Sequence, residues 1–130
     1  EKYLKKDIRF VGKKELTQYF SQQTELIKEI HQQLTEHLNQ RFTIEELSKQ
    51  YLINTSTLKE VFKAVYGLPI ATYMKEYQVH QAMKLLRETD ATIAEIAAQV
   101  GYETQGKFSK AFKDVAQILP TEYRKMQCQK

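Results

Sequence analysis

The stretch "TIAEIAAQVGYETQGKFSKAF", residues 92–112, repeats the pattern of an earlier stretch, "TIEELSKQYLINTSTLKEVF", residues 43–62. Thr43 and Thr92, which begin the two stretches, each stand three residues ahead of a glutamate. In such a capping box the hydroxyl and the carboxylate accept the backbone N–H groups that open a helix. Each copy therefore predicts a short helix, a turn and a second helix.

The second helix of each copy carries four apolar residues at helical spacing. At about 100° per residue each set falls on one stripe, which is the face that a helix buries. The sets expected in the core are Leu58, Val61, Phe62 and Val65 in the first copy, and Phe108, Ala111, Phe112 and Val115 in the second. The opposite face of each helix is polar and largely basic. A short helix, a tight turn and a helix of this kind form a helix-turn-helix unit.

The turns of the two copies differ in sequence, and the second copy has one extra residue in its turn. Gly101 supplies the positive φ that such a turn often needs. Leu52 stands at the equivalent position of the first copy, so we expect its turn to be built differently. Asn54 and Thr104 are placed to cap the second helices.

A long helix is predicted between the copies, over about residues 69–88, and another before them, over about residues 21–39. The apolar stripe of the linking helix changes face partway along, so its halves are expected to pack on different units. At ~1.5 Å per residue the helix extends about 27 Å, close to one ~34 Å turn of B-DNA. We therefore predict an all-α fold with two helix-turn-helix subdomains, over about 43–66 and 92–116, which can reach successive major grooves.

The composition sets limits on the class of protein. The 130 residues are 42% hydrophobic, enough for a core, whereas four glycines and two prolines are too few for a β-sandwich. No apolar run is long enough to span a membrane, and the single cysteine, Cys128, favours a reducing, cytoplasmic location. The net charge is +4, and residues 104–113 hold three lysines and no acid. Such local basic charge suits a polyanion.

Catalytic and metal-binding patterns are missing from the sequence. No glycine-rich phosphate loop, nucleophile–base pair or carboxylate pair is apparent, so we do not expect an enzyme or a cofactor. His31 and His37 fall on different faces of a helix, and neither they nor His80 have a carboxylate or cysteine to complete a metal set.

The stretch "IAEIAAQVGYETQGKFSKAFKDVAQILPTEYR", residues 93–124, resembles the DNA-binding domain of AraC/XylS transcriptional regulators. The resemblance extends, with weaker motifs, over about residues 21–125. It implies seven helices, a domain over residues 21–130, and binding of a double-stranded promoter operator. It also implies an upstream effector-binding sensor domain, of which residues 1–20 would be the tail or linker, and RNA polymerase as a possible partner. The chain departs from the family pattern at Gly106, Gln117 and Gln78.

Both polar helix faces supply candidate contacts to DNA. Lysine can donate to guanine, glutamate can accept from cytosine, and glutamine can pair with adenine. The candidates for reading bases are Ser56, Lys59, Glu60, Gln105, Lys107, Ser109 and Lys110. Lysine, arginine and capped helix N-termini are typical phosphate contacts, and here these are Thr43, Lys63, Thr92, Thr104, Lys113 and Arg124.

A second interpretation is a helical adaptor whose basic faces bind an acidic protein partner. The two interpretations differ in the expected response to DNA. A DNA reader prefers one duplex sequence and loses affinity steeply with salt, whereas an adaptor shows no preference between duplexes.

Overall fold

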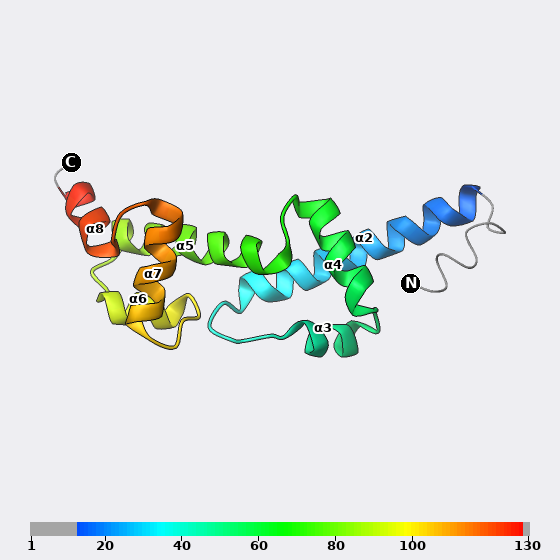
Figure 1. The fold of residues 1–130 in the computed structure, drawn as a ribbon, viewed down its shortest axis with the longest axis horizontal. Coiled ribbons are helices and arrows are strands. Elements are labelled where there is room, and N and C mark those ends of the chain that lie inside the picture. Colours follow the sequence, from blue (N-terminus) through cyan, green and yellow to red (C-terminus); the bar gives the residue numbers. More distant parts are fainter. Residues whose placement is uncertain (1–12, 129–130) are drawn as a thin grey trace. The chain divides into compact units, whose positions relative to one another are not determined.

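The structure, a computed structural model, describes residues 13–128, and these are helical with connecting turns (Figure 1). The helices are α2 (Lys13–Glu36), α3 (Ile44–Tyr51), α4 (Thr55–Tyr66), α5 (Ile70–Glu88), α6 (Ile93–Gln99), α7 (Gln105–Ala116) and α8 (Pro120–Cys128). The predicted all-α class is confirmed. The first helix was expected from residue 21, but α2 already begins at Lys13. Residues 1–12 of the expected linker lie outside the described residues.

The chain divides into two compact units, each with one helix-turn-helix pair. The first unit contains most of α2 together with α3 and α4, and α3 packs against α4. The second unit contains Thr35–Arg41 and the chain from Ala71 onward, and α7 packs against both α6 and α8. In Figure 1 the first pair is green and the second pair is yellow to orange.

The first unit is built around the apolar stripe of α2. Ile27 and Ile30 of this helix are fully buried, as are Leu58 and Phe62 of α4. Leu34, Leu47 and Ile53 are buried with them. The prediction for α4 is wrong at its last position, because Val65 is 36% exposed. Val65 lies in the last turn of the helix, where the stripe runs past the core.

The second unit has a continuous core that joins α5, α6 and α7. Its buried residues are Val79, Ala82, Leu86, Ile96, Ala97, Val100, Phe108 and Phe112. Val115 packs against this cluster and Ala111 is buried, so the stripe predicted for α7 is confirmed. The predicted role of α5 in carrying both units stays a prediction.

Both capping boxes are confirmed. The Thr43 hydroxyl accepts the Glu46 N–H at 3.0 Å, and a Glu46 carboxylate oxygen accepts the Thr43 N–H at 2.9 Å. Thr92 and Glu95 repeat both bonds at 3.1 and 2.9 Å. The two short helices therefore begin where the threonine–glutamate spacing predicts, because the box satisfies backbone donors that a helix N-terminus leaves unpaired.

The turns of the two helix-turn-helix pairs share a backbone conformation that their sequences do not suggest. Leu52 adopts φ +52°, in the left-handed region, and Gly101 adopts φ +99°. The residue after each donates its N–H back into the preceding helix, Ile53 to the Ser48 carbonyl at 3.0 Å and Tyr102 to that of Ala97 at 2.9 Å. The expectation of a differently built turn is therefore wrong in this respect, because leucine takes the glycine conformation at a cost in backbone strain.

We expect Leu52→Gly to raise the free energy of unfolding of the first unit by about 0.5–1 kcal/mol. Glycine removes the left-handed strain, and part of that gain is offset by the greater freedom of glycine in the unfolded chain. The leucine side chain is 92% exposed, so little packing is lost. Urea unfolding measures the change. Ala64→Gly, at an exposed helical position, is the control and should lower stability by about 1 kcal/mol.

Acid should weaken the first unit through His31. Its ring stacks on Tyr66 with centroids 4.2 Å apart, and burial lowers the pKa of His31 below 6.5. The unfolded chain therefore takes up this proton at higher pH than the folded chain does. The contribution is complete above about pH 6.5 and is lost as the pH falls below that value. His31→Phe keeps an aromatic ring on Tyr66 but has no group that takes up this proton. We expect the melting temperature of this variant to fall less than that of the wild type between pH 7.5 and pH 5.5.

Candidate nucleic-acid interface

The side of α4 that faces away from the core carries all four polar residues predicted from the first copy, Ser56, Lys59, Glu60 and Lys63. The last three are exposed, and Ser56 is half-buried in the first turn. The helix begins at Asn54, whose side chain accepts the Ser56 N–H at 2.8 Å. Because Leu58 and Phe62 are buried on the opposite side, α4 presents its polar face outward.

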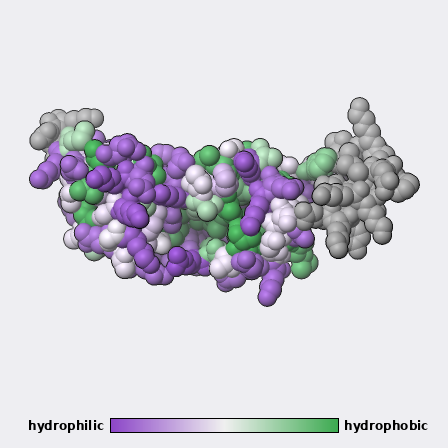
Figure 2. Space-filling model, viewed as in Figure 1, coloured by the Kyte–Doolittle hydropathy of each residue, from purple (hydrophilic) through white to green (hydrophobic). Residues whose placement is uncertain are grey.

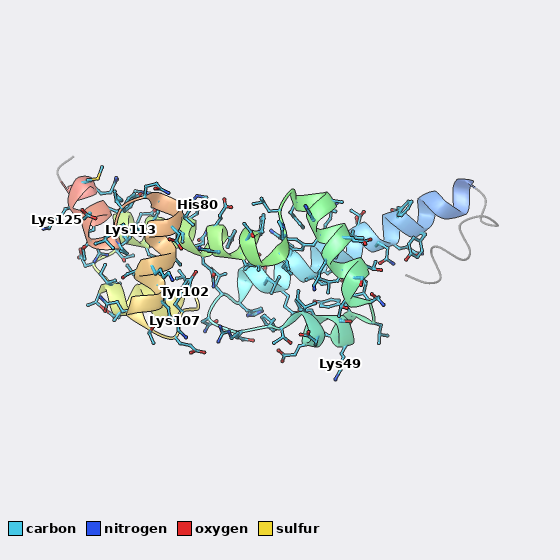
Figure 3. All side chains as sticks on the ribbon, in the orientation of Figure 1. Lys49, His80, Tyr102, Lys107, Lys113 and Lys125 are labelled. Atoms are coloured by element: carbon cyan, nitrogen blue, oxygen red, sulfur yellow. The ribbon has the colours of Figure 1, made fainter. Side chains whose placement is uncertain are left out.

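The outward side of α7 is more basic than that of α4. Gln105, Lys107, Lys110 and Lys113 are exposed, and Ser109 is half-buried. Figure 3 labels Lys107 and Lys113, which lie toward the two ends of the helix. In Figure 2 hydrophilic side chains cover much of the visible surface over α7. The predicted residues of the second copy thus share one helix, with three ammonium groups along it.

The three capping threonines stand at helix N-termini, as predicted. In α3 and α6 a box glutamate accepts the N–H of the threonine, and this hydrogen bond is the main reason why the pKa of Glu46 and that of Glu95 are lowered. Thr104 has Lys107 in place of the glutamate, and its hydroxyl accepts the Lys107 N–H at 3.1 Å. A threonine hydroxyl that accepts a bond keeps its own O–H to donate.

Arg124 has hydrogen-bond partners within the second unit. Its guanidinium donates to the backbone carbonyls of Leu86 at 3.3 Å, Thr89 at 3.1 Å and Ala91 at 2.6 Å. These carbonyls belong to the end of α5 and the segment after it, where helix carbonyls lack intrahelical donors. The side chain therefore ties α8 to the end of α5, and its predicted contact with a phosphate stays a prediction.

Arg124→Met should lower the free energy of unfolding by about 2 kcal/mol, because the apolar stem stays but the three charge-assisted bonds are lost. DNA affinity measured well below the melting temperature should stay close to wild type. The reverse result, an unchanged melting temperature with weakened DNA binding, would assign Arg124 to phosphate contact instead.

Sequence reasoning missed two ion pairs that bring distant cations to α7. Arg41 Nη1 lies 2.6 Å from Glu103 Oε1, and Lys75 Nζ lies 3.0 Å from Asp114 Oδ2. Glu103 Oε2 also lies 3.7 Å from Lys107 Nζ. The first pair is separated by 62 positions and the second by 39, so no local pattern indicates them.

Residues 13–128 offer no sign of a metal site or a membrane-spanning helix. No group of three or more histidine, cysteine, aspartate or glutamate side chains in this part of the chain is arranged to hold a metal ion. Within the same residues, no helix combines the length and apolar character needed to cross a membrane.

Two helix-turn-helix pairs with polar, lysine-bearing second helices define a tandem helix-turn-helix domain of the DNA-binding class. A family model described as "Helix-turn-helix domain" matches residues 47–126. The chain belongs to the AraC-type helix-turn-helix family of transcription regulators.

Individual relatives agree with this family. The chain is 31% identical over 91 residues to the "HTH-type transcriptional activator RhaR" of Mannheimia succiniciproducens. The matched region covers 70% of this chain and 33% of that protein. It thus spans about a third of the length of this relative.

Solved structures agree on the fold. The C-terminal domain of AraT, a response regulator from Geobacillus stearothermophilus, matches with a TM-score of 0.74 at 28% identity, over 78% of this chain and 84% of that one. The DNA-binding domain of AdpA, solved in complex with a target DNA, has a TM-score of 0.73 at 23% identity. This match covers 77% of this chain and 90% of that one, and at this identity it shows a likeness of fold.

Proposed function

We propose that this chain is the DNA-binding part of a transcription regulator and that it reads two adjacent major-groove segments of a double-stranded operator, one with α4 and one with α7. The observation that carries the proposal is the pairing of two outward polar helix faces with two buried apolar stripes. The proposed base readers are Ser56, Lys59 and Glu60 of α4, and Gln105, Lys107, Ser109 and Lys110 of α7.

A second set of residues on these two units is proposed to contact phosphates instead of bases. Lys63 and Lys113 lie in the last turn of their helices and are proposed phosphate contacts. The capped helix N-termini at Thr43, Thr92 and Thr104 are proposed to contact phosphates through their backbone N–H groups. Thr104 differs from the other two, because Lys107 stands where they have the box glutamate.

The remaining roles belong to a longer protein. We propose that residues 21–130 form the DNA-binding domain and that residues 1–20 connect it to an upstream effector-binding domain. The first helix-turn-helix would span about residues 43–66, the linking helix 69–88 and the second helix-turn-helix 92–116. RNA polymerase is a proposed partner of the whole regulator.

Selection from a random-sequence duplex library tests the proposal. We expect the wild-type chain to enrich one sequence and to bind it more tightly than a scrambled duplex. The logarithm of the affinity should fall with the logarithm of salt concentration at about −0.9 per phosphate contacted. Equal binding of selected and scrambled duplexes would favour the adaptor interpretation.

Two single substitutions test the two-groove layout. Lys59→Ala should relax base preference in one half-site, and Lys110→Ala in a half-site about one DNA turn away, each by about 1–3 kcal/mol of discrimination. If both substitutions change preference at the same base pairs, the two helices do not read separate grooves.

A further inference from the structure

One edge of α7, together with the turn before it, carries two lysines between two acidic residues. Lys107 and Lys110 lie on this edge, with Glu103 four residues before Lys107 and Asp114 four residues after Lys110. Residues spaced by three or four positions are neighbours on a helix surface. The carboxylates therefore stand at the two ends of the pair of lysines that is proposed to read bases.

Each of these acids is bound by a cation from another segment of the second unit. Arg41, from the segment after α2, contacts Glu103 at 2.6 Å, and Lys75 of α5 contacts Asp114 at 3.0 Å. Both contacts are hydrogen bonds between oppositely charged groups. The distance from Glu103 to Lys107 is longer, 3.7 Å, which exceeds the hydrogen-bond range. Arg41 is thus the closer partner of this carboxylate.

The two ion pairs affect the electrostatic field at the surface of α7. A carboxylate without a partner, four residues from a lysine, attracts the lysine ammonium to itself. It also repels a phosphate brought near the same edge. Pairing with an outside cation weakens both effects, and it leaves the lysine ammonium freer to turn toward a base edge.

We propose that Arg41 and Lys75 are positioning residues for DNA recognition. By binding Glu103 and Asp114, they keep Lys107 and Lys110 available to the DNA. The inference rests on the proposed function of α7 and adds two residues that lie outside both helix-turn-helix pairs.

Double-mutant cycles test the inference with the full chain and the duplex that the wild type selects. We expect Arg41→Ala to weaken binding about fivefold, but less than about twofold when Glu103→Gln is also present. Lys75→Ala should behave in the same way, with Asp114→Asn as its second substitution. Glu103→Gln alone should leave affinity equal or higher, because it removes a negative charge near phosphates.

Two controls separate this role from general effects of charge and folding. Lys28→Ala removes the cation of another exposed ion pair, with Glu25 at 3.6 Å on α2, and makes the same change in net charge. It should change affinity less than about twofold. Arg41→Lys keeps the charge and should keep the affinity. The exposed pairs should leave melting temperatures within about 2 °C of wild type. If Arg41→Ala melts lower than this, Arg41→Gln takes its place in the cycle.

The outcomes are distinguishable. Equal weakening by Arg41→Ala with and without Glu103→Gln would mean that Arg41 contacts DNA directly, and would overturn the inference, as would no weakening in either background. A wild-type chain that prefers no duplex sequence would overturn the proposed function, and this inference with it.

Discussion

Gly101→Ala is expected to lower the free energy of unfolding of the second unit by roughly 3 kcal/mol. Two effects add at this residue. Its φ of +99° lies where side chains are rarely tolerated. A methyl group here would also lie 2.1 Å from the Leu38 carbonyl oxygen and 3.0 Å from the Gln78 amide nitrogen. Because the nearer atom belongs to the backbone, the segment that carries Leu38 has to move away.

Gly67→Ala is the matched control for this prediction. Gly67 also has a positive φ, +84°, but a methyl group there would have no neighbour within 4 Å. It should therefore show the conformational cost alone, about 1 kcal/mol. Urea unfolding followed by far-ultraviolet circular dichroism gives both values. If the two glycines prove equally tolerant, Leu38 does not approach Gly101 as described.

Phe112→Ala should lower the free energy of unfolding by about 3–5 kcal/mol. The Phe112 ring is fully buried, 5.8 Å from the Phe108 ring and 5.7 Å from the Tyr123 ring between centroids. Alanine would leave a cavity between α7 and α8 that a close-packed core cannot fill by small shifts. Calorimetric or urea unfolding measures the loss.

The equivalent residue of the first unit tests whether the repeat extends to energetics. Phe62 is also fully buried, and Phe62→Ala should cost a similar ~3–5 kcal/mol. Lys113→Ala, next to Phe112 but exposed, should stay within about 0.5 kcal/mol of wild type. A Phe112→Ala variant as stable as Lys113→Ala would mean that the buried stripe is assigned to the wrong face.

The polar faces of α4 and α7 could be predicted because a buried stripe at helical spacing also determines which side chains point outward. The same pattern was wrong at Val65, because periodicity identifies a face but does not say where the core ends. The expectation for the first turn came from residue type and was wrong in one respect. Leucine suggested a turn without a positive φ, but Leu52 adopts φ +52° while Ile53 donates its N–H to the Ser48 carbonyl.

Arg124 shows the limit of reading charge from sequence. Its position after "PTEY" was compatible with a phosphate contact, and only the folded chain brings it to three carbonyls 33 to 38 positions away. Arg41 and Lys75 lie outside the repeated motif and carried no signal for a role at α7. An exposed cation takes its partner from whichever surface lies beside it, and that surface is set by packing.

The sequence by itself determined the all-α class, the two capped helix-turn-helix units and the residues on their outward faces. These follow from hydrogen bonds and apolar spacing within a few helical turns, which are interactions between near neighbours along the chain. Only the tertiary structure decided the close approach of Leu38 to Gly101, the structural role of Arg124 and the pairing of Glu103 and Asp114 with outside cations. Each of these joins segments far apart in the chain, and such contacts exist only after the cores of the units have formed.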